Sequence, residues 1–217
     1  MTPLRTRLDD ATADRRLLDH PFYKAWAAGT LTTEDLAHYA GQYWRQVEAF
    51  PSYLETIAAR LPEGPTRAAV LANLADERDD DHPGLWLDFA AALGSKRDAV
   101  EATPADPETQ ACVDAFTTAC SEASPEFALG MLYGYESQTP AVAETKVVGL
   151  KEHYGIDGKG LTYFELHGEL DVQHSAEMAE AIEALGGNSH DAAAGARAGA
   201  AAIWDLLDGV VRARGIC

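Results

Sequence analysis

The hydrophobic and polar positions of the chain repeat with the period of an α-helix along most of its length. The clearest case follows Thr32, where the sequence TTED has the form of a helix-capping signal. Apolar side chains then recur three or four residues apart, at Leu36, Tyr39, Tyr43, Val47 and Phe50. This spacing places them on one face of a helix, which Pro51 is expected to kink or to restart.

The same period predicts further helices over residues 65–78, 83–94, 107–122, 125–154, 159–185 and 191–214. The first of these has its expected apolar face at Ala68, Val70, Leu71, Leu74 and Ala75. Pro140 is expected to break or kink the helix over 125–154. No segment alternates like a strand over a useful length. The sequence therefore predicts an all-α bundle of about seven to nine helices, in a single domain over residues 1–217.

Charge and composition narrow the classes of function. Asp and Glu number 35 against 17 Lys and Arg, which gives a net charge of −18. A chain this acidic repels phosphate backbones and anionic lipids, so neither nucleic acid nor membrane is an expected partner. The charged N-terminus has no signal-peptide core, and no apolar run reaches the roughly 18 residues of a membrane span. A cytoplasmic protein is expected, and its 3 Cys form no CxxC pair that would indicate a zinc site.

The segment His167-x3-Asp171-x2-His174 carries the clearest chemical signal. Seven residues fall about 20° short of two helical turns, so the three side chains share one stripe of a helix. Two imidazoles and a carboxylate that face one way are suited to binding iron or manganese. The sequence therefore predicts a metal site on the helix over 159–185.

Three upstream positions could complete a second metal site. Glu77 lies at the end of one predicted helix, His82 at the start of the next, and Glu136 among apolar and small residues in LYGYESQTP. A buried carboxylate is costly unless it is paired or bound to a metal. With the stripe, these residues offer three imidazoles and three carboxylates, enough for two divalent ions with open positions for O2. An ion pair between Glu136 and Lys146 is the alternative to a metal role.

Four segments resemble the heme-oxygenase-like diiron oxidases: HPFYKAWAAGTLTTEDLAHYAGQYWRQVEAFPSYL, NLADERDDDHPGLW, LYGYESQTPAVAETKVVGL and YFELHGELDVQHS. The resemblance covers residues from about 18 to 179. Within the family, the motifs are most similar to the self-sacrificing para-aminobenzoate synthases, and more distantly to pyrroloquinoline-quinone synthase C and TenA-type proteins. The resemblance implies a heme-oxygenase-like helical fold without heme. It also implies a dinuclear Fe/Fe or Fe/Mn centre that activates O2 with an external reductant, in a homodimer.

Carried over by motif, the resemblance implies the metal ligands Glu77, His82, Glu136, His167, Asp171 and His174. It also implies that Tyr23 supplies the ring of para-aminobenzoate for folate biosynthesis and Lys146 its amine, with Tyr39 and Tyr43 nearby. The spacing from Glu77 to His82 is two residues shorter than the family pattern. Five residues on an unbroken helix would separate the side chains by about 140°. The helix must therefore break between them, or Asp79 is the first carboxylate instead.

Two other functions stay open at the level of sequence. The same metal centre could oxidise an external small molecule, such as an amino acid or a fatty acid, with Tyr23 and Lys146 merely lining its pocket. The chain could instead be a non-catalytic protein that kept the fold and binds partners through its surface. The set of six metal-ligand candidates argues against that reading, because unpaired buried carboxylates destabilise a fold that gains nothing from them.

Overall fold

The computed structural model describes residues 2–216, and helices account for most of them. The prediction of an all-α fold is confirmed. The α-helices are α1 (Pro3–Thr12), α2 (Pro21–Ala27), α3 (Thr33–Arg60), α4 (Pro65–Asp79), α5 (His82–Ala92), α6 (Arg97–Glu101), α7 (Pro107–Glu122), α8 (Pro125–Glu136), α9 (Thr139–Tyr154), α10 (Lys159–Ala184) and α11 (Ser189–Arg214). Residues 2–216 thus contain more helices than the seven to nine predicted, because α1, α2 and α6 are short and show no long periodic pattern.

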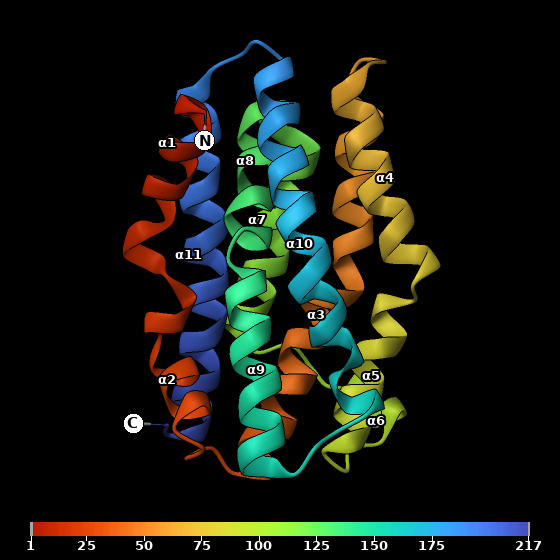
Figure 1. Cartoon of the computed structure of the whole chain (residues 1–217), viewed down its shortest axis with the longest axis vertical. Coiled ribbons are helices and arrows are strands. Elements are labelled where there is room, and N and C mark those ends of the chain that lie inside the picture. The colour runs from red at the N-terminus through yellow and green to blue at the C-terminus, as the bar shows by residue number, and fades with distance from the viewer. Residues whose placement is uncertain (1, 217) are drawn as a thin grey trace.

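The long helices lie side by side along the long axis of the molecule (Figure 1). Helix α10 runs through the middle of the bundle and contacts α4 and α5 on one side and α8 and α9 on the other (Figure 1). Helix α11 lies against α8, and α3 lies against α7 and α4. Side chains on α10 can therefore meet residues from both halves of the bundle.

The two prolines that were expected to interrupt helices behave differently. Helix α3 continues through Pro51 to Arg60. Around Pro140 the expected break is present, because α8 ends at Glu136 and Pro140 lies in the first turn of α9. The break makes Glu136 the last residue of its helix.

The predicted apolar face of α4 is wrong in part. Among its expected members, the exposed residues are Ala68, Leu71 and Ala75, and Leu71 is 43% exposed. The buried face of α4 instead consists of Thr66, Val70, Asn73, Leu74 and Glu77. Two polar residues, Asn73 and Glu77, thus take the place of apolar ones on the face toward the core.

Close packing of α8 against α11 depends on residues without side chains. Gly130 and Gly134 on α8 face α11, where a Cβ atom on Gly134 would lie 2.1 Å from the carbonyl oxygen of Ala196. Gly195 and Gly199 on α11 face the α8 backbone in the same way. Interlocking glycines four residues apart let the two backbones approach directly and fix the position of the helix that carries Glu136.

Across residues 2–216, no helix is both long and apolar enough to cross a bilayer. Cys112 and Cys120 are buried and carry free thiols. Both lie on α7 as small packing residues. Cys217 lies outside the described residues.

Candidate functional site

Six buried His and carboxylate side chains come together in the bundle as two groups of three. One group consists of Glu77, His82 and His167, and the other of Glu136, Asp171 and His174. Within each group, the candidate ligand atoms all lie within 4.8 Å of one another. Helix α10 contributes to both groups, because its stripe spans two turns. The six residues expected to bind metal are thus the ones that the fold gathers.

A break in the helix brings Glu77 and His82 together. Helix α4 ends at Asp79 and α5 begins at His82. Between them Asp81 adopts the left-handed conformation, with φ 50° and ψ 49°, and its carboxylate accepts a hydrogen bond from Gly84 N at 3.2 Å. Asp tolerates this conformation better than most residues. Asp79 is exposed and belongs to neither group.

In the first group, the two imidazoles converge on one carboxylate. His82 Nδ1 lies 2.9 Å from Glu77 Oε2, and His167 Nε2 lies 3.8 Å from Glu77 Oε1. The other nitrogen of His167, Nδ1, donates to the carbonyl oxygen of Tyr163 at 2.8 Å, which leaves Nε2 free to bind an ion. Burial raises the pKa of Glu77, but the two imidazoles outweigh it and lower the pKa to about 2. This carboxylate is therefore ionised and ready to bind a cation.

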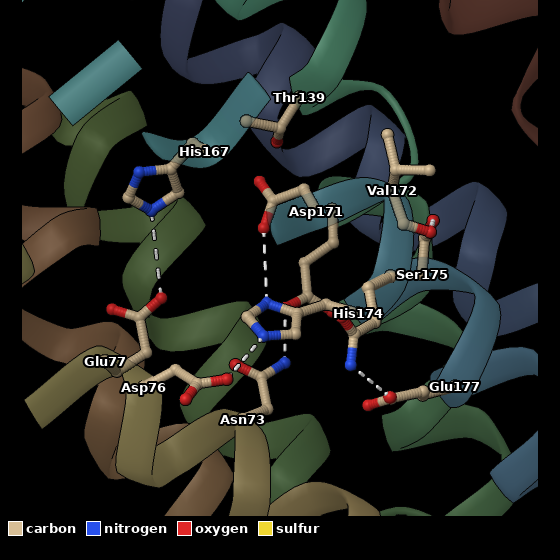
Figure 2. A network of polar contacts seen from close by, with 12 residues as sticks. Asn73, Asp76, Glu77, Thr139, His167, Asp171, Val172, His174, Ser175 and Glu177 are labelled. Carbon is tan, nitrogen blue, oxygen red and sulfur yellow. Dashed lines mark hydrogen bonds and ion pairs between the residues drawn. The ribbon is translucent and has the colours of Figure 1, made fainter. Parts of the chain in front are cut away.

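In the second group, two of the three side chains, His174 and Glu136, have a supporting contact from α4. Figure 2 shows His174 between two carboxylates, with Nδ1 3.4 Å from Asp171 Oδ1 and Nε2 3.0 Å from Asp76 Oδ2. Asn73 Nδ2 donates to Glu136 Oε1 at 2.7 Å. The second group thus has its own hydrogen-bonded shell, and Asp171 and Glu136 keep further oxygen atoms directed at the centre.

Several buried atoms of the two groups fit a bound metal. Four of these atoms have no hydrogen-bond partner within residues 2–216: Nδ1 and Nε2 of His82, Nδ1 of His174, and Oε2 of Glu136. His82 Nδ1 and Glu77 Oε2 are close, yet their geometry is not that of a hydrogen bond. Because buried polar atoms are nearly always satisfied, lone pairs that face one another indicate a position for a cation.

Without a bound cation, Glu136 and His174 of the second group are protonated at neutral pH. Burial and the neighbouring charge of Asp171 raise the pKa of Glu136 to about 8. Burial lowers the pKa of His174, but Asp171, Glu136 and Asp76 outweigh it and raise the pKa to about 9. A metal ion entering this group would have to displace those protons.

Next to the first group lies a buried lysine among aromatic rings. Lys146 Nζ donates to the Tyr39 hydroxyl at 2.7 Å, and that hydroxyl lies 3.5 Å from the hydroxyl of Tyr23. Nζ also lies 5.4 Å from the centre of the Tyr23 ring and 5.2 Å from that of Tyr43. Burial lowers the pKa of Lys146 to about 7. All four residues expected near the reacting ring, including Tyr23 itself, therefore lie in one cluster.

The alternative ion pair between Lys146 and Glu136 does not form. Lys146 bonds to Tyr39, and Glu136 accepts from Asn73. Both side chains are buried, so a surface role for Lys146 is also excluded. The lysine belongs to the tyrosine cluster and the glutamate to the metal-ligand candidates.

Four residues that the sequence did not single out connect these parts. Tyr135 and Tyr163 line a narrow cavity with Tyr43, Lys146 and His167. The ring of Tyr163 stacks on that of His167 at 4.0 Å. A local signal exists for Tyr163, which precedes His167 by one helical turn. Asn73 and Asp76 had no such signal, because their contacts depend on how α4 meets α8 and α10.

Residues 37–208 match the family model described as iron-containing redox enzymes. The chain belongs to this family. It is therefore a metal-dependent oxidoreductase, and the resemblance to heme-oxygenase-like diiron oxidases is confirmed. Family membership together with the two His and carboxylate groups supports a dinuclear metal centre.

Several known proteins are similar to this chain over most of their length. The chain is 32% identical to the 4-aminobenzoate synthase of Chlamydia pneumoniae, over 100% of this chain and 99% of the relative. It is 35% identical to the 4-aminobenzoate synthase of Nitrosomonas europaea, over 95% and 90% of the two chains. A TenA homolog from Pseudomonas syringae has a TM-score of 0.85 over 97% and 93%, at 17% identity. That last likeness shows the fold alone.

Proposed function

We propose that this protein makes 4-aminobenzoate, or para-aminobenzoate, for folate biosynthesis from its own Tyr23, with O2 as the oxidant and Lys146 as the nitrogen donor. Two relatives that carry the name 4-aminobenzoate synthase support the product. The observation that supports self-processing is the buried cluster in which Lys146 Nζ lies 5.4 Å from the Tyr23 ring and 2.7 Å from the Tyr39 hydroxyl. Donor and acceptor of the nitrogen are thus already neighbours.

The surroundings prepare both groups for such a reaction. An amine must be neutral to act as a nucleophile, and burial lowers the pKa of Lys146 to about 7. Burial raises the pKa of Tyr23, so its phenol stays protonated until it is oxidised. The hydroxyl of Tyr39 lies between the two and can pass a proton from one to the other.

The conversion can be written from the structures of tyrosine and 4-aminobenzoate. Both contain a ring substituted at opposite positions. The Cα–Cβ bond of Tyr23 breaks and leaves a glycine residue, while Cβ is oxidised to the carboxyl carbon and releases four electrons. Nitrogen from Lys146 replaces the phenol oxygen, which leaves as water, and Cε of Lys146 becomes an aldehyde with release of two more electrons. Two O2 molecules accept these six electrons together with two from an external reductant, so that their oxygen atoms end in the products and in water. Because Tyr23 and Lys146 are consumed, each chain would act once.

Two triads would hold the metal ions: Glu77, His82 and His167 for one, and Glu136, Asp171 and His174 for the other. These nitrogen and oxygen donors suit Fe/Fe and Fe/Mn alike. When bound, the ions supply the activation of O2. Tyr163 stacks on His167 and lies in edge contact with Trp86, which in turn stacks on Tyr43, so aromatic rings connect the metal side to the lysine cluster.

An external substrate is less well supported by the shape of the site. The cavity beside Lys146 and Tyr43 has room for roughly one water molecule. That space suits O2, whereas an amino acid or a fatty acid would require side chains to move. Repeated turnover of an added compound by the metal-loaded protein, with Tyr23 intact, would favour this second function.

Labelling of the protein itself tests the proposal. The protein is produced with ring-¹³C tyrosine and ¹⁵N-amine lysine, loaded with Fe(II) and Mn(II) without oxygen, and then exposed to O2 and reductant with no substrate added. We expect doubly labelled 4-aminobenzoate and a matching mass loss at Tyr23. Tyr23→Phe and Lys146→Arg should give no such product. Tyr53→Phe and Lys151→Arg are matched controls, because Tyr53 is buried against Phe116 and Lys151 is exposed on the same helix as Lys146.

Two outcomes would contradict the proposal. Labelled product from Tyr23→Phe would place the ring source at another tyrosine. Product that lacks the ¹⁵N label would remove Lys146 as the donor.

We also infer a cytoplasmic homodimer that uses small molecules and O2 and binds neither nucleic acid nor membrane. The net charge of −18 supports the absence of both of those partners. Light scattering after size-exclusion chromatography tests the dimer, and a mass near 23.3 kDa would contradict it.

A further inference from the structure

One carboxylate outside the two triads contacts a metal-ligand candidate directly. Asp76 lies on α4, next to Glu77, and its side chain is 47% exposed. Its Oδ2 atom lies 3.0 Å from Nε2 of His174, on the edge of the imidazole ring that faces away from Asp171 (Figure 2). In this arrangement Nε2 donates to Asp76, and Nδ1 is directed at the centre of the second group.

The two imidazoles on α10 are held in opposite senses. His167 donates from Nδ1 to the carbonyl oxygen of Tyr163 at 2.8 Å and directs Nε2 toward Glu77. His174 directs Nδ1 inward and is held through Nε2. The hydrogen bond of one ring nitrogen decides which nitrogen can bind a metal. A backbone carbonyl inside the helix therefore determines which nitrogen of His167 can bind a metal, and a side chain at the surface does so for His174.

Helix α4 supports the second group at two points. Asn73 donates to Glu136 at 2.7 Å, and Asp76 accepts from His174 at 3.0 Å. The two residues are three apart in the sequence, so they lie on neighbouring positions of one helix face. Glu77, on the same helix, is a member of the first group. Removing Asp76 would thus affect the second group and leave the members of the first in place.

We propose that Asp76 is a positioning residue for the second metal: by accepting the Nε2 proton of His174, it fixes the tautomer that offers Nδ1 to the ion shared with Glu136 and Asp171. This inference rests on the proposed metal ligands. Without Asp76, the imidazole is free to carry its proton on Nδ1, where Asp171 is the nearest acceptor. The neutral ring would then present its lone pair at Nε2, away from the centre, and metal binding at Nδ1 would require the proton to move to Nε2, where it no longer has Asp76 as its acceptor.

The expected effect is selective. Loss of a partner that orients a metal-bound imidazole typically lowers metal affinity by about 10- to 100-fold. Asp76→Ala should therefore weaken one of two sites by about that factor and leave the other unchanged. Asp76→Asn keeps an acceptor oxygen without the charge and should recover part of the affinity. Asp79→Ala is the matched control, because Asp79 is an exposed acidic residue at the end of the same helix.

The experiment measures metal binding rather than product. Each full-length protein is titrated with Mn(II) without oxygen, and free and bound metal are measured by equilibrium dialysis and by electron paramagnetic resonance. Two neighbouring Mn(II) ions give an exchange-coupled spectrum, and a single bound ion gives a resolved hyperfine pattern. We expect wild type and Asp79→Ala to reach the coupled spectrum at the same free Mn(II). Asp76→Ala should show the single-ion spectrum at that concentration and the coupled one only at 10- to 100-fold more, as the loss of affinity requires.

Three outcomes would overturn the assignment. The first is unchanged Mn(II) affinity at both sites in Asp76→Ala. The second is an equal loss of affinity in Asp76→Ala and Asp79→Ala. The third is loss of both sites together in Asp76→Ala, which would indicate a general effect of charge or a folding defect. A wild type that binds fewer than two ions would remove the ligand assignment and this inference with it. A wild type that binds two ions and makes no 4-aminobenzoate would contradict the proposed function alone.

Discussion

Lys146 Nζ donates a 2.7 Å hydrogen bond to the Tyr39 hydroxyl, with no carboxylate in contact with the amine among the described residues. An ammonium ion in such a place lacks a counter-charge and is surrounded by aromatic rings. The rings of Tyr39 and Phe164, whose centres lie 5.2 and 4.9 Å from Nζ, offset only part of that cost. The amine is therefore held close to the point at which it loses its proton.

Lys146 should titrate near neutral pH. Burial lowers its pKa from 10.5 to about 7 in the folded protein, so between these values the unfolded chain binds more protons than the folded one. Relative to Lys146→Met, the free energy of unfolding of wild type should therefore rise with pH above about 7. NMR of ¹³Cε-labelled lysine gives the pKa, and denaturation across this range gives the stability. Lys151→Met is the exposed control; a lysine titration near 10 for Lys146 would contradict the expectation.

The turn at Asp81 should contribute to the stability of the protein. Asp81→Ala loses the cap on Gly84 N and places Ala at φ 50°, which together should cost about 1–3 kcal/mol. Asp81→Asn tolerates the same conformation and keeps a capping oxygen, so it should stay near wild type. Asp80→Ala is the control, since Asp80 is exposed with φ −89°. Urea denaturation measures the cost, and equal stability of Asp81→Ala and Asp80→Ala would exclude this role.

The parts of the site that local spacing determines could be predicted from the sequence. His167, Asp171 and His174 lie on one helix, so their common direction follows from helix geometry alone. The approach of Glu77 to His82 does not follow from helix geometry alone, because a five-residue spacing requires a helix break, and only Pro83 and the acidic run indicate one.

Contacts between helices could not be predicted in the same way. Hydrophobic periodicity predicts that Leu71 on α4 faces the core, but the structure exposes it. The buried face of this helix includes the polar residues Asn73 and Glu77 instead. The contact of Asp76 with His174 spans 98 positions in the sequence, and it depends on how closely α4 approaches α10. An exposed aspartate near the end of a helix gives no sign of such a partner.

Gly134 should be intolerant of a side chain because of its contact with α11. A Cβ atom there would lie 2.1 Å from the carbonyl oxygen of Ala196, so Gly134→Ala must separate the two backbones. Such overpacking typically costs about 1–3 kcal/mol. Gly168 on α10 is the matched control, since its nearest neighbour would be 3.8 Å away. Gly168→Ala should be neutral or stabilising by about 0.5–1 kcal/mol, and thermal unfolding of both variants distinguishes the two cases.

Metal binding at neutral pH should release protons from the second group. The pKa values of Glu136 and His174 are raised to about 8 and about 9, so both side chains carry a proton at about pH 7 that a metal ion must displace. Release should fall as the pH is raised through this range, because the sites are then already deprotonated. A pH indicator or calorimetry in buffers of different ionisation enthalpy measures the protons released as Mn(II) is added. Glu136→Gln should release fewer protons. Proton release that does not change between pH 7 and 9.5 would show that the metal does not displace protons from Glu136 and His174.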